Sequence, residues 1–347
     1  MAFFDTLFKD IGVDLGTANS LVYVKNRGIV INEPSIAAVN QKTNQILAVG
    51  EEARRMLGRT PSHISVIRPL VNGVISDFEM AQELLRQFLR RLSRGSMMSY
   101  RRGILAIPNS LTEVERKSVE DVALNAGCSK VYLIESPVAA ALGANLPIEL
   151  PTASLIIDIG GGTTDIAVIS MGGTVTSKTL KVAGDKFNED ITRFLRDEFR
   201  LAIGEPTAEF AKIAVGSAVP LDGRLEVPVR GRDISSGLPR EVVVKNNQIR
   251  QAITKSLDTI VESVRDVIES APPELTGDML KQGIYICGGG ALLRGIDELI
   301  ERETGVATRV VEEPLTCVAR GLGYVVDGFD RHRELLDNPL KPLVINL

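Results

Sequence analysis

Two short glycine-containing segments carry the residue types needed to hold a polyphosphate. The first reads Asp14-Leu-Gly-Thr-Ala-Asn19, and the second reads Asp158-Ile-Gly-Gly-Gly-Thr-Thr-Asp165. Glycine allows backbone N–H groups to approach an anion closely. Thr17, Asn19, Thr163 and Thr164 would add side-chain donors. The two segments therefore predict a pair of phosphate-binding loops.

The aspartates that open these segments indicate a metal ion. Asp14 and Asp158 each follow an apolar run, so each is expected at the end of a strand. Two carboxylates that face one another repel. A hydrated Mg²⁺ between them would remove that repulsion and would also neutralise a polyphosphate. We therefore expect Asp14 and Asp158 to hold Mg²⁺ through water.

A third glycine run, Gly288-Gly289-Gly290, is expected to follow a strand and to open a helix that continues through Glu303. It could lie against a flat base or ribose, where side chains would clash. Each glycine segment alone could be an ordinary tight turn, but the three together favour a nucleotide site. Other nucleotide motifs do not match, because the chain has no GxxxxGK[ST] sequence and the run at Gly160 leads into a strand.

The two aspartate segments also resemble each other in their surroundings, which predicts two related domains. Each has an apolar strand, a glycine turn and then an alternating strand: Ile11–Leu15 with Ser20–Lys25, and Leu155–Ile159 with Ile166–Ser170. Helices are expected between the strands, so the pattern is typical of an α/β fold. Each hairpin loop is expected to face a shared cleft.

Three helices have clear sequence signals. An apolar stripe predicts a helix over 77–94, and Thr112-Glu-Val-Glu115 is a capping box for a helix that ends at Gly127. A third helix is expected over 248–270, where Pro272-Pro273 end it. Its inward residues are Ile249, Ile253, Leu257, Ile260, Val261, Val264 and Ile268.

Composition excludes several other classes of function. The chain has 347 residues, a formal charge of −4 and no Trp, so neither charge nor aromatic stacking favours nucleic acid. Three cysteines without CxxC spacing and two histidines do not make a zinc site. No apolar run reaches the length of a membrane-spanning helix.

The three glycine motifs are similar to the phosphate-1, phosphate-2 and adenosine motifs of the actin, sugar kinase and heat-shock chaperone superfamily. Within it, the chain resembles the MreB/Mbl family of bacterial actins over nearly its whole length. Further matching segments are Asn32-Glu-Pro-Ser35, Gly58-Arg-Thr-Pro61, Gly73-Val-Ile-Ser-Asp77 and Pro272-Pro-Glu-Leu275.

This resemblance implies an actin-like (ribonuclease H-like) fold, with two duplicated α/β domains around a nucleotide cleft and four subdomains. The expected boundaries are 1–35, 70–150 and 318–347 for subdomain IA, 36–69 for IB, 151–186 and 248–317 for IIA, and 187–247 for IIB.

The resemblance also implies a site for ATP and Mg²⁺. The residues that match the family's phosphate contacts are Thr17, Ala18, Asn19, Gly161, Gly162 and Thr163. Those that match its ribose and adenine contacts are Glu209, Phe210, Ala211 and Lys212, followed by the adenosine loop Gly288, Gly289, Gly290 and Ala291.

The function implied is that of a rod shape-determining cytoskeletal protein. Members form antiparallel double filaments on the inner face of the cell membrane and organise lateral cell-wall synthesis, so the chain is expected to be cytoplasmic and peripheral. The alternatives are a sugar kinase, which would need a catalytic Asp and inserted substrate loops, and a chaperone-type ATPase, which would need a substrate-binding domain.

Two apolar segments are candidate membrane contacts. Phe3, Phe4, Leu7 and Phe8 share one helical face, as in an interfacial anchor, although the segment could instead dock on its own domain. Met97 and Met98 fall in a loop near several arginines, which suits an anionic bilayer, although local packing is the alternative.

One position departs from the family pattern. The residue before the family's Pro-x-Ala-Ala-Ala helix is a Glu that orients the attacking water, and here it is Ser136. A hydroxyl accepts a proton far less readily than a carboxylate. Glu135 is adjacent but is expected to point elsewhere, and Thr163, the family's second hydrolysis-linked residue, is retained. We therefore expect intact ATP binding and slowed hydrolysis.

Overall fold

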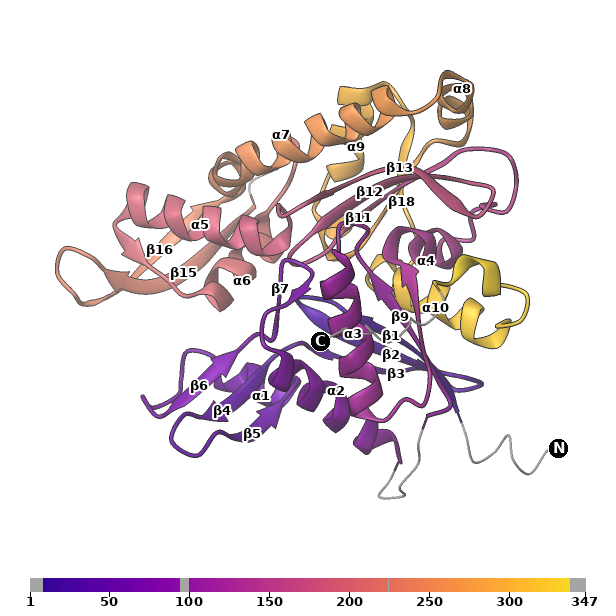
Figure 1. Ribbon diagram of the computed structural model, residues 1–347. Coiled ribbons are helices and arrows are strands. Elements are labelled where there is room, and N and C mark those ends of the chain that lie inside the picture. The colour runs from indigo at the N-terminus through magenta and orange to yellow at the C-terminus, as the bar shows by residue number, and fades with distance from the viewer. Residues whose placement is uncertain (1–8, 94–99, 224, 338–347) are drawn as a thin grey trace, which may run out of the picture. The chain divides into compact units, whose positions relative to one another are not determined.

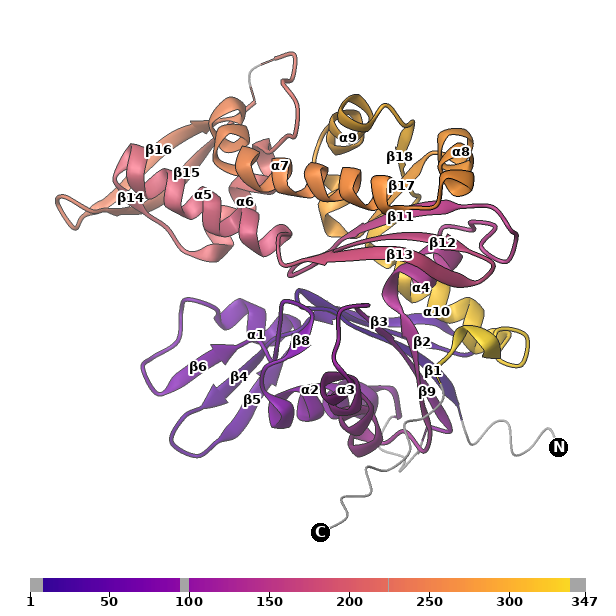
Figure 2. The same cartoon turned by 45° about the horizontal axis from the view of Figure 1, so that its top comes forward.

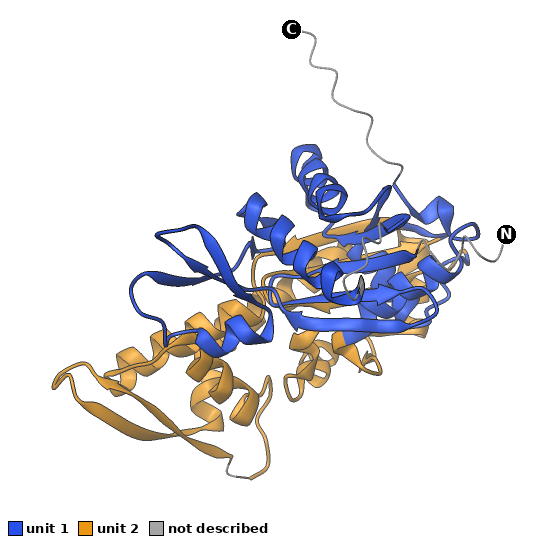
Figure 3. Cartoon of the chain, turned by 90° about the horizontal axis from the view of Figure 1, so that it is seen from below, with its two compact units in different colours: residues 1–150, 171–173, 316–347 blue, residues 151–170, 174–315 orange. Residues whose placement is uncertain are grey.

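The computed structural model describes residues 9–93, 100–223 and 225–337, which divide into two compact units (Figure 1). Figure 3 colours unit 1, residues 1–150, 171–173 and 316–347, in blue and unit 2, residues 151–170 and 174–315, in orange. The fold is mixed α/β in both units, as the sequence predicts.

Unit 1 contains strands and helices in the following order. They are β1 (Asp10–Leu15), β2 (Asn19–Val24), β3 (Gly28–Pro34), β4 (Ala37–Asn40), β5 (Gln45–Val49), α1 (Glu51–Met56), β6 (Ile64–Ile67), β7 (Leu70–Val71), β8 (Val74–Ile75), α2 (Phe78–Ser93), β9 (Arg102–Ile107), α3 (Glu113–Ala126), β10 (Val131–Glu135), α4 (Ser136–Gly143), α10 (Cys317–Asp327) and the 3₁₀ helix η3 (Arg333–Leu335).

The main sheet of unit 1 has the strand order β10-β9-β1-β2-β3. β1 is antiparallel to β2 and parallel to β9, which is in turn parallel to β10. Alternate residues of β1 face two helical layers: Ile11 and Val13 join the core cluster that includes α2, and a side chain at Gly12 would overlap Leu322 of α10. Both faces of β1 are therefore covered, which explains the apolar run Ile11-Gly12-Val13 between its two aspartates.

Local signals in unit 1 produce the expected helices. α2 buries Ala81, Leu84, Leu85 and Phe88 on one face, in agreement with the predicted stripe. Thr112 caps α3, since its hydroxyl accepts the N–H of Glu115 at 3.3 Å while the Glu115 carboxylate accepts the N–H of Thr112 at 2.8 Å. Both helices and the capping box are confirmed, and α3 ends at Gly127 as predicted.

Unit 2 contains the following elements. They are β11 (Ser154–Ile159), β12 (Thr164–Ser170), β13 (Gly173–Leu180), α5 (Gly184–Phe199), β14 (Leu201–Ala202), α6 (Glu205–Val215), β15 (Glu226–Asp233), β16 (Pro239–Lys245), α7 (Asn246–Ser270), α8 (Pro273–Gln282), β17 (Ile284–Cys287), the 3₁₀ helix η1 (Gly289–Leu292), α9 (Ile296–Thr304), β18 (Thr308–Val310) and the 3₁₀ helix η2 (Pro314–Thr316). The first residue of β13 and the last residue of η2 belong to unit 1.

The main sheet of unit 2 repeats the arrangement of unit 1. Its order is β13-β12-β11-β17-β18, with β11 antiparallel to β12 and parallel to β17. In both sheets a central strand forms a hairpin with the next strand in sequence and pairs on its other side with a parallel strand. The duplication predicted from the two aspartate segments is confirmed at the level of topology. Each unit also has a separate three-stranded sheet, β5-β4-β6 in unit 1 and β14-β15-β16 in unit 2.

The longest helix, α7, lies along the main sheet of unit 2 (Figure 2). Ile249, Ile253, Leu257, Ile260 and Val264 are buried in its core, while Ile268 is only partly buried. The prolines that end α7 also start α8, a short helix that was not predicted from the sequence. Proline is tolerated there because the first N–H groups of a helix have no partner within it.

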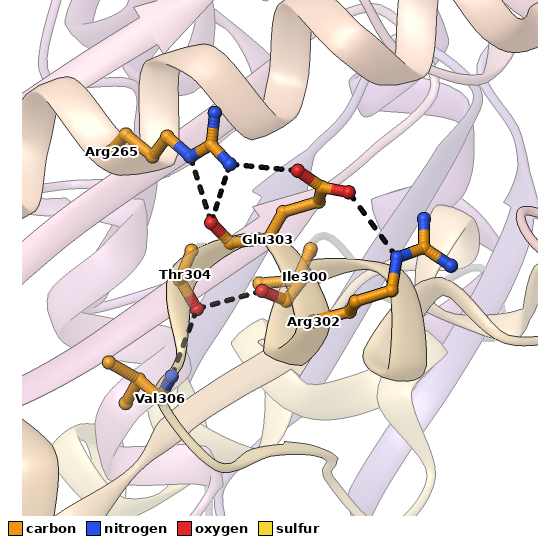
Figure 4. A network of polar contacts seen from close by, with 6 residues as sticks. All are labelled: Arg265, Ile300, Arg302, Glu303, Thr304 and Val306. Carbon is orange, nitrogen blue, oxygen red and sulfur yellow. Dashed lines mark hydrogen bonds and ion pairs between the residues drawn. The ribbon is translucent and has the colours of Figure 1, made fainter.

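The C-terminal end of α9 is fixed to α7 by Arg265 (Figure 4). Its guanidinium donates two hydrogen bonds to the Glu303 carbonyl oxygen, at 2.9 and 2.6 Å, and pairs with the Glu303 carboxylate at 2.8 Å. A cation at this position satisfies a carbonyl that the helix leaves unpaired.

The expectation that the glycine run opens a helix directly is wrong. After Gly288 the chain forms the 3₁₀ helix η1, and α9 begins only at Ile296. Gly295 intervenes with a φ of +72°, a left-handed conformation that breaks helical continuity. Within the described residues, no helix is both long and apolar enough to cross a bilayer.

Candidate functional site

The hairpin loop of unit 1 connects β1 to β2 through Gly16, Thr17 and Ala18. The Gly16 N–H donates to the Asn19 carbonyl at 3.1 Å, which closes the turn. A Cβ atom at position 16 would lie 2.7 Å from that same oxygen, so only glycine fits. The loop conformation is therefore dictated by its own backbone.

Two buried serines, Ser20 and Ser35, stabilise this loop through hydrogen bonds. The Ser35 hydroxyl donates to the Gly16 carbonyl at 2.6 Å, and the Ser35 N–H donates to the Ala18 carbonyl at 2.9 Å. Ser20 and Ser35 share a further hydrogen bond of 2.8 Å. With the carbonyls of Gly16, Ala18 and Asn19 engaged within the protein, the loop is suited to offer N–H groups to an anion. Ser20 is not among the predicted site residues, and Ser35 is predicted only as part of the family-matching segment Asn32–Ser35.

The side chain of Thr17 is held by a second turn. Its hydroxyl accepts the N–H of Gly73 at 3.0 Å, and the residue is only 6% exposed. Accepting this bond leaves the hydroxyl hydrogen available for donation. Gly73 has a φ of +76° in the turn between β7 and β8, and it appeared in the sequence analysis only within a matching segment.

Asp14 lies one residue before the end of β1 and is half-buried. Burial raises the pKa of its carboxyl group from 3.8 to about 7. A carboxylate in such a setting gains most from a nearby cation. No group of three or more His, Cys, Asp or Glu side chains comes together among the described residues. A metal ion at Asp14 would therefore need oxygen ligands from water or from a bound phosphate.

Asn109, Glu135 and Ser136 lie at the same edge of the unit 1 sheet as Asp14. The register of the parallel strands pairs Asp14 with Ala106 and Ala106 with Ile134, so the strands end together. The Asn109 amide donates to the Glu135 carboxylate at 3.0 Å. Ser136 is the buried first residue of α4. The expectation that Glu135 points away from an attacking water stays a prediction.

The hairpin loop of unit 2 repeats the turn of unit 1. The Gly160 N–H donates to the Thr163 carbonyl at 2.9 Å, in the place of the Gly16–Asn19 bond. The N-terminus of α5 supports this loop, because the N–H groups of Gly184 and Asp185 donate to the carbonyls of Gly160 and Gly161 at 3.2 and 2.8 Å. The two predicted phosphate loops thus share one backbone design.

The adjacent threonines of this loop differ in their contacts. Thr164 is fully buried, and its hydroxyl donates to the Val182 carbonyl at 2.7 Å, so the expectation that it donates to a ligand is wrong. Thr163 is half-buried, and its hydroxyl donates to Asp165 at 3.2 Å. Successive residues at the start of a strand face opposite sides, which separates the two side chains.

The helix α6 places the predicted ribose and adenine residues on different faces. Glu209 and Lys212 are three positions apart and share one face. The Lys212 ammonium donates to the Gly184 carbonyl at 2.9 Å, which ties α6 to the start of α5. Ala211 packs in the hydrophobic core, whereas Phe210 is 53% exposed. Their role in binding stays a prediction.

The glycine run after β17 packs directly on the end of β11. Gly288 has a φ of +81°, and a side chain there would overlap the Asp158 carboxylate and the Ile159 carbonyl. A side chain at Gly290 would overlap Ile159. Within unit 2, close packing therefore brings the Gly288–Ala291 segment, Asp158 and the Gly160–Thr163 loop to one edge of the sheet. The glycines are needed for this contact whether or not a base lies against them.

The predicted membrane residues Phe3, Phe4, Leu7, Phe8, Met97 and Met98 lie outside the described residues. The described chain next to them is informative, however. The Arg101 N–H donates to the Lys9 carbonyl at 3.0 Å, so the two segments join the fold at adjacent points.

Comparisons with known proteins agree with this architecture. The family model described as MreB/Mbl protein matches residues 8–334. The cell shape-determining protein Mbl of Bacillus subtilis is 46% identical, over 93% of this chain and 97% of that protein. The cell shape-determining protein MreB of Escherichia coli is 44% identical, over 93% and 94% respectively. A crystal structure of MreB5 of Spiroplasma citri bound to ADP has a TM-score of 0.90 at 42% identity, covering 94% of this chain and 98% of that one.

Proposed function

Because the chain belongs to the MreB/Mbl family, we propose that it is a cell shape-determining cytoskeletal protein that binds ATP and assembles into filaments. The observation that carries the proposal is the pair of equivalent hairpin loops. Each follows an aspartate, turns at a glycine (Gly16 or Gly160) and is closed by the equivalent backbone hydrogen bond from that glycine. The same loops support ATP binding over binding of a ligand without phosphates.

The proposed ligand is ATP with Mg²⁺. Structures of the Spiroplasma citri relative hold ADP or AMPPNP, which supports an adenine nucleotide here. Thr17, Ala18, Asn19, Gly161, Gly162 and the backbone N–H of Thr163 would hold the phosphates, with Glu209–Lys212 and Gly288–Ala291 at the nucleoside. The donor set at Asp14 fits a magnesium ion bound through water, since a single desolvated carboxylate lacks the ligands for a protein-only site. Bound Mg²⁺ would neutralise phosphate charge.

Slow hydrolysis is the second part of the proposal. Ser136 occupies the position where the family has its water-orienting Glu, and it is the buried first residue of α4. Loss of one well-placed base costs about 10²–10⁴-fold in rate. Because ATP favours the polymerising state and its cleavage loosens that state, slow hydrolysis would give long-lived filaments.

The substitution Ser136→Glu tests this part. Single-turnover phosphate release from the variant is expected to exceed that of the unmodified chain by about 10²-fold or more. Ser136→Ala is the matched control, because it removes the hydroxyl without adding a base and should release phosphate no faster than Ser136. Equal rates for Ser136→Glu and the unmodified chain would mean that Glu135 or another group supplies the base.

We also propose that the filaments are antiparallel double filaments on the inner face of the cell membrane, where they organise lateral cell-wall synthesis. The backbone contact between Lys9 and Arg101 supports one membrane-facing region, because it joins both candidate apolar segments to the same point of unit 1. Arg90 and Arg101, which are close in sequence to the Met97-Met98 segment, are exposed. Their positive charges would attract anionic lipids. The four-subdomain division, with the β5-β4-β6 and β14-β15-β16 sheets in the two smaller subdomains, belongs to the same proposal.

Pelleting with ATP, Mg²⁺ and anionic liposomes tests the cytoskeletal role. A filament-forming protein is expected to sediment with ATP and to bring liposomes down with it. A sugar kinase would stay in the supernatant and consume ATP only with an acceptor sugar. A chaperone-type ATPase would also stay in the supernatant, so absence of pelleting would reject the proposal.

A further inference from the structure

A buried carboxylate, Asp165, underlies the loop of unit 2. Asp165 lies on β12 and is 4% exposed. Its two oxygens have separate donors: Thr163 Oγ1 lies 3.2 Å from Oδ2, and Thr179 Oγ1 from β13 lies 2.5 Å from Oδ1. The carboxylate is therefore fixed from the loop on one side and from the neighbouring strand on the other.

This arrangement determines how the Thr163 hydroxyl can be used. The Thr163 hydroxyl donates to Asp165 Oδ2, so its hydrogen is directed at the carboxyl group. Burial raises the pKa of Asp165, and the hydrogen bonds from Thr179 and Thr163 oppose that rise. Only the oxygen lone pairs then remain for a ligand. Thr163 in this state cannot donate through its side chain to a phosphate, but it can accept a hydrogen bond from a water molecule. Thr164 supplies no alternative, because its hydroxyl is used by the Val182 carbonyl.

We propose that Asp165, steadied by Thr179, is a positioning residue that keeps the Thr163 hydroxyl as a hydrogen-bond acceptor for the water that attacks ATP. This inference rests on the proposed nucleotide-hydrolysing function. Attack of the water oxygen on the terminal phosphorus breaks the bond to ADP and yields phosphate. Thr163 orients the water through one of its hydrogens, and the proton lost from that water leaves with the phosphate product.

A double-mutant cycle between Asp165 and Thr163 tests the proposal. Asp165→Asn is expected to lower single-turnover phosphate release about 10–100-fold, because an amide can turn its N–H₂ group toward Thr163 and occupy the lone pairs. The affinity for AMPPNP should stay within threefold. In a Thr163→Val background, Asp165→Asn should cost no more than about twofold, since the residue acts through Thr163. The cycle comprises the unmodified pair, the two single variants and the double variant. Each of these is measured both with Ser136 and with Ser136→Glu, which is expected to be faster.

Two further variants separate positioning from folding. Thr179→Val removes the second donor and should slow phosphate release about 3–10-fold, and Thr179→Ser should restore it to within twofold. Thr164→Val is the matched control: it deletes a buried hydroxyl beside Thr163 that does not contact Asp165. It should lower the unfolding temperature while leaving the rate within twofold.

Several results would overturn the inference. Unchanged rates for Asp165→Asn would do so, as would losses that add to those of Thr163→Val. A loss that disappears at saturating Mg²⁺ would assign Asp165 to the metal instead. Binding of AMPPNP without phosphate release from any chain, Ser136→Glu included, would leave no hydrolysis for Asp165 to serve. Failure of the unmodified chain to bind AMPPNP at all would reject the proposed function itself.

Discussion

The environment of Asp14 indicates that its carboxylate would be stabilised by a cation. Its carboxylate is half-buried near the end of a strand that is covered on both faces, and burial raises its pKa to about 7. Folding therefore works against ionisation of this group at neutral pH. A cation would reverse this penalty, which is the behaviour expected of a residue that serves a metal–phosphate complex.

We predict that Asp14 makes the nucleotide-free protein less stable as pH rises from about 4 to about 8. The folded-state pKa lies above the unfolded value of 3.8, so the folded state holds an extra proton in this range. Its stabilising contribution is complete below pH 3.8 and is lost as pH passes through about 7. The loss should be about 1–3 kcal/mol after allowance for solvent screening.

The measurement is the free energy of unfolding in denaturant across this pH range, for the unmodified chain and for Asp14→Asn. The variant lacks the ionisable group, so the difference between the two proteins should grow in favour of the variant toward pH 8. A difference that is constant with pH would contradict the assignment.

At the scale of elements, the crossing of α4 and α10 positions the start of α4. The helices approach so closely that a side chain at Gly321 would overlap the Ala139 carbonyl, and one at Gly143 would overlap the Cys317 carbonyl. The Cys317 thiol donates to the Ala140 carbonyl at 3.1 Å. Since Ser136 is the first residue of α4, this crossing also fixes the residue that departs from the family pattern.

We predict that Gly321→Ala destabilises the protein by more than about 2 kcal/mol, because the added methyl group would overlap backbone on the facing helix. Gly277→Ala is the matched control in α8. Nothing lies within 4 Å of the added Cβ atom there, so alanine should stabilise the protein by about 0.5–1 kcal/mol. Thermal and denaturant unfolding of both variants measures the contrast. Equal effects of the two substitutions would show that α4 and α10 are not packed this closely.

At the scale of the whole molecule, the chain is a duplicated fold whose two units have diverged in their additions. The main sheets share their strand order, and the hairpin loops share their closing hydrogen bond. The difference lies at the neighbouring parallel strand. In unit 1, β9 is followed by Asn109, which binds Glu135, whereas in unit 2, β17 is followed by glycines that pack on β11. At this edge of the sheet, unit 1 therefore has polar side chains, whereas unit 2 has glycines without side chains.

We predict that Phe4→Ser combined with Phe8→Ser weakens liposome binding by at least about tenfold without preventing ATP-dependent assembly in the absence of lipid. Each buried phenylalanine contributes about 1.5–3 kcal/mol before the cost of ordering, and many linked copies in a filament multiply the effect. Co-sedimentation with anionic vesicles measures it.

The control for this experiment is Val114→Ser, which removes a 72% exposed apolar side chain from α3. It should leave vesicle binding unchanged. If the double phenylalanine variant also pellets with vesicles as the unmodified chain does, the apolar N-terminal segment is not the membrane anchor.

Features that depend on local chemistry and on hydrophobic periodicity were predictable from the sequence. Apolar stripes located α2 and α7, the capping box located α3, and the repeated aspartate–glycine pattern established the duplication. These features can be predicted because each depends on residues that are only a few positions apart in the sequence. The same reasoning failed at Gly295 and at Pro273, where a left-handed residue delays α9 and a proline starts a helix as well as ending one.

The hydrogen-bond partners of the individual site side chains could not be predicted from the sequence, because they depend on tertiary contacts. Thr163 and Thr164 are identical in type and adjacent, yet one hydroxyl is turned to Asp165 and the other to the Val182 carbonyl. The serines beneath the Gly16 loop, the Gly73 contact to Thr17 and the Thr179 contact to Asp165 likewise join residues far apart in the chain. Such contacts depend on which strands pair in the folded sheet, and the spacing of residues in the sequence does not specify strand pairing.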